Sequence, residues 1–273
     1  MRLLTADLGN SRLKLRAFRA REDGPAEVVG AADLRRDPGW LDEARAWLEA
    51  AVRPAGPSGA AGRGATGRID RAALSSVASA PDAVELADVL AGFADELLRA
   101  PDAGLENRCR EPNAVGRDRL YAARGALAAL PGREVVVLDC GTALTVDAAS
   151  PPGVFHGGAI APGPDLLAAA LGRGAAQLFE IDPAPGAPAL GRDTRAALTA
   201  GVVQGLRGAA AHLAREVARE AGFERPAWVV TGGAAPLLMQ PAPVLADPLE
   251  LPDLVHHGLL VALGVRPPAA EPA

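Results

Sequence analysis

The sequence has few of the residues on which disulfide-bonded, zinc-centred and nucleic-acid-binding proteins depend. Its two cysteines, Cys109 and Cys140, lie far apart in the chain, and its four histidines are scattered. This spacing predicts neither a disulfide framework nor a transition-metal cluster. Lys14 is the only lysine, the formal net charge is −5, and no group of arginines stands clear of acidic residues. The charge pattern therefore gives no support for nucleic-acid binding.

Long apolar segments are also absent. The longest apolar stretch, residues 196–218, is interrupted by polar and charged side chains, whereas a membrane-spanning helix needs about 18 or more apolar residues in a row. A strand-like run begins at Leu3, where a signal peptide would have its charged and apolar regions. We expect a cytoplasmic protein that does not enter a membrane.

The sequence does contain enough apolar material for a large core. Hydrophobic residues make up 49% of the 273 residues, and a chain of this length forms one large domain or two of about 100–150 residues. Period-two alternation, apolar runs and turn residues predict strands at 3–7, 12–17, 72–77, 134–139, 143–147 and 227–230. Helical periodicity predicts helices at 40–52, 81–99, 118–130, within 191–220, and at 254–263. A flexible, low-complexity loop is expected at 54–68.

Two of the predicted strand pairs form a repeated hairpin. In each, an acid near the end of the first strand is followed by a glycine turn: Asp7-Leu-Gly9-Asn10-Ser11 and Asp139-Cys-Gly141-Thr142-Ala143. The two hairpins lie about half the chain apart, which predicts two similar halves. We place these halves at residues 1–118 and 119–265 and expect a disordered tail at 266–273.

The hairpins suggest a chemistry. A tight glycine turn directs backbone N–H groups into a small space that can bind phosphate oxygens, and an acid beside it can hold a cation that balances the phosphate charge. One such turn in each half would clamp a polyphosphate between the two. The sequence has no P-loop, and no G-x-G-x-x-G follows a strand. Taken singly, each hairpin is more often an ordinary turn with a capping aspartate, but the matched pair favours a phosphate site.

Several short motifs occur in an order that resembles a known family. They are Asp7–Ser11, Ser75–Val77, Pro112 with Val115–Arg119, Asp139–Ala143 with Asp147, Gly157–Gly163, Gly191 and Thr194 with Gly201, and Thr231–Gly233. The chain resembles the superfamily of acetate and sugar kinases, actin and heat-shock ATPases, and more closely, over residues 3–264, the type III pantothenate kinases. This resemblance implies an α/β fold of two similar ribonuclease-H-like domains, duplicated mixed sheets flanked by helices, with the active site in the cleft between them.

The resemblance also implies an activity, the ATP-dependent phosphorylation of pantothenate to 4'-phosphopantothenate in coenzyme A biosynthesis. It implies ATP with Mg²⁺, a monovalent cation (K⁺ or NH₄⁺) held by Asp139, a homodimer, and Asp118 as the general base for the pantothenate hydroxyl. The residues implied to bind ATP or its phosphates are Asp7, Leu8, Gly9, Asn10, Ser11, Arg12, Leu13, Lys14 and Thr142. Those implied to bind pantothenate are Cys109, Gly116, Arg117, Asp118, Arg119 and Thr194.

Single residues have alternative roles. Asp118 precedes a predicted helix and could serve as its N-cap, a role that is compatible with that of a base. Asp147 is either a second acid of the cation site or an exposed residue at a strand end. His256 and its neighbour His257 are assigned to packing or to a dimer surface. Two positions depart from the family pattern, because Cys109 stands in place of a tyrosine and Arg117 in place of a small residue.

Two other functions are compatible with the same fold. A non-catalytic transcriptional accessory protein is expected to lose the acids, whereas Asp7, Asp118 and Asp139 are all present. A kinase or phosphatase of the same superfamily with another small-molecule substrate would keep them, and the departure at Cys109 leaves that alternative open.

Overall fold

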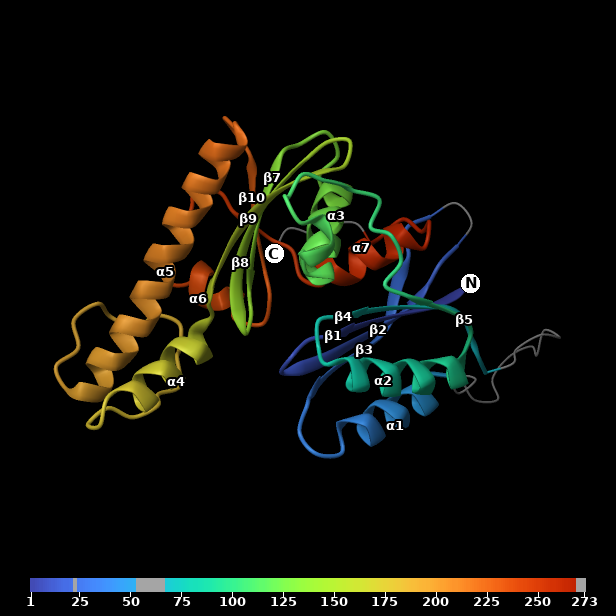
Figure 1. Ribbon diagram of the computed structural model, residues 1–273, viewed down its shortest axis with the longest axis horizontal. Helices are drawn as coiled ribbons and strands as arrows, with labels where there is room; N and C mark the ends of the chain where they lie inside the picture. The colour runs from blue at the N-terminus through green and yellow to red at the C-terminus, as the bar shows by residue number, and fades with distance from the viewer. Residues whose placement is uncertain (22–23, 53–66, 269–273) are drawn as a thin grey trace. The chain divides into compact units, whose positions relative to one another are not determined.

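The protein folds into two compact units, which are described separately. The computed structural model describes residues 1–21, 24–52 and 67–268 (Figure 1). The first unit contains the described parts of Met1–Gly104, Gly116–Tyr121 and Val255–Ala269, and the second contains Leu105–Val115 and Ala122–Leu254. The bounds 1–118 and 119–265 for the two halves stay a prediction. Residues 54–66 of the predicted loop and 269–273 of the predicted tail lie outside the described residues.

The first unit contains a mixed sheet whose central strand has an antiparallel neighbour on one side and a parallel neighbour on the other. The strands of this sheet are β1 (Arg2–Leu8), β2 (Arg12–Arg19), β3 (Glu27–Arg35), β4 (Ile69–Ser76) and β5 (Ala94–Arg99). Their order is β3-β2-β1-β4-β5, and β1 pairs antiparallel with β2 and parallel with β4. The pair β2–β3 is antiparallel and the pair β4–β5 is parallel. β1 therefore joins its neighbour in the chain to a strand that follows some sixty residues later.

Both faces of this sheet are covered. The accompanying helices are α1 (Trp40–Val52), α2 (Ala80–Phe93), the start of α3 (Arg117–Ala129) and most of α7 (Leu254–Ala262). Leu4 and Leu8 of β1 pack in a buried cluster with α1 and α2 on one face (Figure 1). Thr5 is turned the other way, and its hydroxyl hydrogen-bonds to Nδ1 of the buried His256 of α7 at 2.7 Å. For His256, the structure supports the packing role.

The second unit repeats the arrangement of the first. Its strands are β6 (Glu106–Asn107), β7 (Val135–Cys140), β8 (Ala143–Ser150), β9 (Val154–Pro162), β10 (Ala227–Thr231) and β11 (Leu249–Glu250). Their order is β11-β10-β7-β8-β9-β6, and β7 pairs antiparallel with β8 and parallel with β10. β8–β9 is antiparallel, as β2–β3 is, and β10–β11 is parallel, as β4–β5 is. The second sheet has one further strand, β6, which pairs with β9. The duplicated mixed sheets implied by the family resemblance are confirmed.

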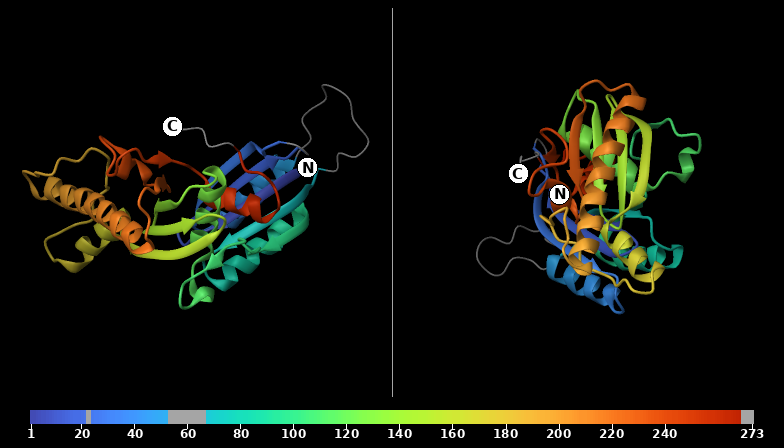
Figure 2. Two further views of the ribbon diagram at one scale, coloured as in Figure 1. Left: turned by 90° about the horizontal axis from the view of Figure 1, so that it is seen from above. Right: turned by 90° about the vertical axis from the view of Figure 1, so that its left-hand side faces the viewer.

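A long helix covers one face of the second sheet. The helices of this unit are α4 (Pro164–Gly174), α5 (Thr194–Ala221), α6 (Ala235–Met239) and the short 3₁₀ helix η1 (Pro112–Ala114). α5 lies across the sheet (Figure 2), and its Val203 and Leu206 share a buried cluster with Leu138 of β7. The Asp193 carboxylate caps this helix by accepting the Ala196 N–H at 2.8 Å. No helix in the described part of the chain is long and apolar enough to cross a membrane.

One predicted helix is wrong in its second part. The helix expected over 81–99 ends at Phe93, and Ala94–Arg99 form β5. This segment pairs in parallel with β4, so contacts with a strand distant in the sequence decide its backbone. The sequence signals also do not predict β3, whose side chains are mostly exposed and therefore lack a clear apolar alternation.

Candidate active site

The first hairpin places a short exposed turn at the end of the central strand. β1 and β2 are joined by the three residues Gly9–Ser11, and the Gly9 N–H donates to the Arg12 carbonyl at 2.9 Å. Asp7 and Lys14 are cross-strand partners and are half-buried, whereas Asn10 and Ser11 are exposed. The turn is therefore accessible and is flanked by one acid and one cation.

The second hairpin has the same construction with one residue fewer. β7 and β8 are joined by Gly141 and Thr142, and the Gly141 N–H donates to the Ala143 carbonyl at 2.9 Å. Asp139 is half-buried near the end of β7, and Thr142 is exposed. Both predicted turns are thus formed, each close to an aspartate of a central strand.

The parallel neighbour of each central strand adds a hydroxyl beside the acid. In the first sheet Asp7 pairs with Ser75 of β4, and in the second Asp139 pairs with Thr231 of β10. Ser75 and Thr231 are both buried. The sequence motifs contain both hydroxyl residues, but their equivalence follows only from the register of the strands.

A glycine leaves room for the second acid. Gly232 follows β10 with φ +95°, and a Cβ atom there would overlap Oδ1 of Asp139 and the carbonyl oxygen of Cys140. Any larger residue at this position would have to displace the Asp139 carboxylate or the end of β7. The Thr231–Gly233 motif therefore lies directly against the candidate cation ligand.

Asp118 is in the first unit, in the first turn of α3. It is the second residue of this helix, not its N-cap, and its Oδ1 accepts the Arg119 N–H at 2.8 Å. A Cβ atom at Gly116 would lie 2.6 Å from the same oxygen, so this glycine gives the carboxylate its space. Burial raises the pKa of Asp118 above its ordinary value, and the hydrogen bond and charge of Arg119 act in the opposite direction.

Within the first unit, Gly116 lies near both this carboxylate and Val77, a residue that is hydrogen-bonded to the first hairpin. The Cβ position at Gly116 lies 3.8 Å from Cγ1 of Val77. The Val77 N–H in turn donates to the Leu8 carbonyl at 3.1 Å, one residue before the turn. A half-buried acid with a raised pKa and a turn suited to phosphate thus belong to one compact unit, an arrangement suited to proton abstraction during phosphoryl transfer.

Comparison with known proteins identifies the family. The sequence model of the type III pantothenate kinases matches residues 3–216. The type III pantothenate kinase of Sphingopyxis alaskensis is 33% identical over 267 residues, which cover 94% of this chain and 96% of the relative. That of Alkalilimnicola ehrlichii is 35% identical over 260 residues, which cover 94% and 95%. This chain belongs to the type III pantothenate kinase family.

Solved structures support the same fold. A Campylobacter jejuni protein named as a Baf family transcriptional activator aligns with a TM-score of 0.54 and 17% identity, covering 96% of this chain and 97% of the other. A Sinorhizobium meliloti protein named as a 2-dehydro-3-deoxygalactonokinase also gives 0.54 and 17%, with 98% of each chain covered. At this identity the likeness concerns the fold alone.

The residues that the type III pantothenate kinase pattern assigns to pantothenate are divided between the two units. Gly116, Arg117 and Arg119 accompany Asp118 in the first unit, whereas Cys109 and Thr194 belong to the second. Cys109 is half-buried, and its Sγ lies 3.3 Å from where a Cβ atom at Gly157 would stand.

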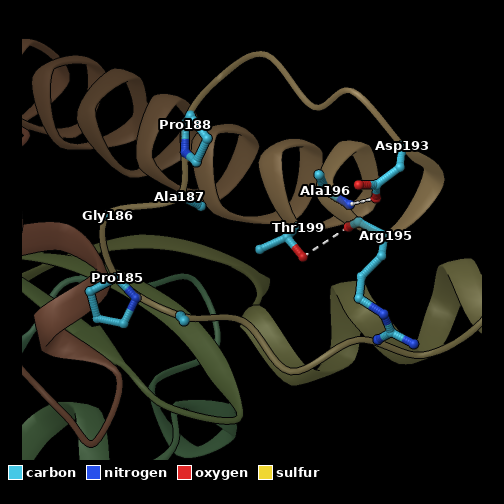
Figure 3. Close-up of a pocket in the computed structure, with 9 residues that line it drawn as sticks. Pro185, Gly186, Ala187, Pro188, Asp193, Arg195, Ala196 and Thr199 are labelled. Atoms are coloured by element: carbon cyan, nitrogen blue, oxygen red, sulfur yellow. Dashed lines mark hydrogen bonds between the residues drawn. The ribbon is translucent and has the colours of Figure 1, made fainter.

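A pocket lies beside Thr194 within the second unit. Thr194 is exposed at the start of α5, between Asp193 and Arg195, which both line a pocket of about 360 Å³. Figure 3 shows this pocket between the start of α5 and the preceding segment. Its other lining residues are 184–188, Ala196 and Thr199.

One expectation about a charged residue needs revision. Asp147 is 2% exposed within β8, so it is not an exposed residue at a strand end. Among the described residues, no group of three or more His, Cys, Asp or Glu side chains could hold a metal ion.

Sequence reasoning misses one residue at the first turn. Arg36 donates to the carbonyl oxygens of Gly9 and Asn10. It lies outside every motif, and no local signal in the sequence marks it.

Proposed function

We propose that this chain transfers the γ-phosphoryl group of ATP to the primary hydroxyl of pantothenate, giving ADP and 4'-phosphopantothenate. The observation that carries the proposal is the half-buried Asp118 carboxylate, with its raised pKa, in the same unit as the Asp7–Lys14 hairpin. Membership of the type III pantothenate kinase family supports the choice of both substrates.

In this mechanism Asp118 acts as the general base. The pantothenate oxygen attacks the γ-phosphorus, the bond from phosphorus to the ADP oxygen breaks, and the hydroxyl proton passes to Asp118. A raised pKa suits the role because a stronger base accepts the proton more readily, provided that it is ionised at the working pH. Arg119 limits the rise and helps to keep the carboxylate ionised.

The remaining predicted residues bind and orient the substrates. Residues 10–12 would offer backbone N–H groups to the phosphates, Lys14 would offer a charge, and Thr142 would make a second contact to ATP. Cys109, Thr194 and residues 116–119 would hold pantothenate. Beyond proton removal, phosphoryl transfer depends mainly on such positioning and on charge stabilisation.

Cations are part of the proposal. Mg²⁺ would enter with ATP, and Asp139 would bind K⁺ or NH₄⁺. Since no acidic cluster accompanies Asp139 among the described residues, most other ligands would be neutral backbone or ligand oxygens. Such a site suits a singly charged ion better than a tightly held divalent one.

We further propose that the active form is a homodimer. Large apolar side chains of β9, α4 and the segment before α5 are exposed: Ile160, Leu166, Leu171, Phe179 and Leu190. Ile160 and Leu190 are 64% and 72% exposed, so these large apolar side chains are available for a partner to cover. A second copy of this chain is the proposed partner.

The substrate is tested by a direct assay. The purified protein is expected to consume ATP with pantothenate and not with acetate or a panel of sugars, and mass spectrometry should detect phosphopantothenate. Turnover with another member of the panel would instead favour the sibling kinase. Absence of turnover with every substrate, in a protein that binds ATP, would favour a non-catalytic role.

The base is tested by Asp118→Asn. Turnover is expected to fall by roughly 10²–10⁴, the usual contribution of a positioned base. The fold should persist, because the asparagine Oδ1 can still accept the Arg119 N–H. The measurements are kcat at saturating substrates and thermal melting. A folded variant with near-normal kcat would exclude Asp118 as the base.

The raised pKa of Asp118 also predicts how activity and stability change with pH. Wild-type kcat/KM should fall as the pH drops through the raised pKa, because only the ionised carboxylate accepts a proton. A folded-state pKa above the unfolded one also means that stability is lost as Asp118 ionises with rising pH. Asp118→Asn should therefore melt no lower than the wild type at neutral pH.

The monovalent cation is tested by exchanging the buffer salt. With Mg²⁺ constant, activity is expected in potassium or ammonium buffer and to be much lower in sodium at equal ionic strength. Asp139→Asn should reduce this difference, because the ligand that favours a bound cation has lost its charge. Equal rates in all three salts would contradict a selective site.

The dimer is tested by Ile160→Asp, with Val84→Asp as the matched control. Val84 of α2 is 49% exposed and belongs to the first unit, whereas the proposed interface residues belong to the second. Light scattering after gel filtration should give a dimer for the wild type and the control, and a monomer for Ile160→Asp. A wild-type monomer, or an Ile160→Asp dimer, would contradict this interface.

A further inference from the structure

Arg36 contacts all three residues of the first turn. It follows the last residue of β3, and its Nη1 donates to the carbonyl oxygens of Gly9 at 3.1 Å and Asn10 at 2.9 Å. Its backbone N–H donates to the Ser11 carbonyl at 3.1 Å. The three consecutive carbonyl groups of the turn are thus bound by one residue.

Arg36 is itself held in place. Its Nη2 donates to Oδ2 of Asp82 at 2.5 Å, in the first turn of α2, and its guanidinium lies 5.5 Å from the centre of the Trp40 ring. The Arg36 side chain is only 14% exposed. Ser79 hydrogen-bonds to the same carboxylate, and this bond and the Arg36 charge lower the pKa of Asp82. The guanidinium is therefore fixed by α1 and α2 before any ligand binds.

The hydrogen bonds from Arg36 to the turn carbonyls also determine where the N–H groups of the turn point. In a trans peptide the C=O and N–H groups point in opposite directions, and the cis bonds of the described chain are at prolines elsewhere. With the carbonyls of residues 9–11 directed at Arg36, the N–H groups of Asn10, Ser11 and Arg12 are directed away from it. Successive N–H groups on one side of a turn can bind an anion.

The second unit has a different residue at the equivalent position. Gly163 follows β9 as Arg36 follows β3, and its N–H donates to the Thr142 carbonyl at 3.1 Å, as that of Arg36 does to Ser11. A Cβ atom at Gly163 would overlap the carbonyl oxygen of Gly141. The backbone bond is therefore common to both hairpins, and the side-chain contacts are particular to the longer first turn.

We infer that Arg36 is a positioning residue that orders the first turn for binding the phosphates of ATP. This inference rests on the proposed function. Because its charge is paired with Asp82, Arg36 acts through the geometry of its planar fork and not as a phosphate ligand. Lysine would keep the charge but offers no fork that can hold two carbonyls and a carboxylate together.

The test compares Arg36→Ala and Arg36→Lys with Arg68→Ala. Arg68, also in the first unit, binds one carboxylate (Asp95 at 2.6 Å) and two carbonyls (Gly92 at 3.1 Å and Ala94 at 2.6 Å), but none of them in the turn. Calorimetry measures ATP affinity without the second substrate, and kinetics measure KM for ATP and for pantothenate separately.

Arg36→Ala is expected to weaken ATP binding about tenfold, the effect of losing one or two net hydrogen bonds, and to raise KM for ATP but not for pantothenate. Arg36→Lys should recover only part of the affinity. Arg68→Ala should bind ATP as the wild type does, even where its melting temperature falls.

Two results would overturn the inference. One is wild-type ATP affinity in Arg36→Ala, which would leave Arg36 a structural role only. The other is full affinity in Arg36→Lys, which would assign the effect to charge. If Arg36→Ala does not fold, Arg36→Lys decides the question alone. Failure of the proposed function would be distinct, because it would appear as wild-type protein that binds ATP but does not phosphorylate pantothenate.

Discussion

The structure depends on the pairing of one strand in each sheet. β1 and β7 each run antiparallel to the next strand in the chain and parallel to a distant one. The end of the central strand therefore meets a tight turn on one side and the end of a parallel strand on the other, where ligands bind in open α/β sheets. An aspartate at this point has a hydroxyl residue beside it in both units, Ser75 or Thr231.

Two glycines of the sequence motifs leave space for aspartate side chains. Gly116 and Gly232 stand where a Cβ atom would press on Oδ1 of Asp118 and Asp139 respectively. In each case the absence of a side chain allows the carboxylate to remain where it is. The glycine at 116 and the first glycine after β10, at 232, thus have the same physical explanation, although they lie in different units.

The two hairpins have diverged within this common frame. The second turn is one residue shorter and lies so close to Gly163 that no side chain fits there. The longer first turn leaves space for a side chain at the equivalent position, and Arg36 occupies it. Both turns keep the backbone hydrogen bond from the residue after β3 or β9, and the first turn is also held by a side chain, that of Arg36.

The sequence by itself determined the two hairpins, the central strands and most helices, because these depend on signals within a few residues of one another. It also determined the family, through the order of several short motifs along the chain. The alternation along Arg12–Ala17 and the Asp-x-Gly turns are of this kind. Only the tertiary structure decided that Ala94–Arg99 join β4 as a strand, that Asp147 is buried, that Ser75 stands beside Asp7, and that Arg36 reaches the first turn. Each of these depends on contacts between residues far apart in the chain, and the free energy of such contacts outweighs the local preferences that a sequence pattern reports.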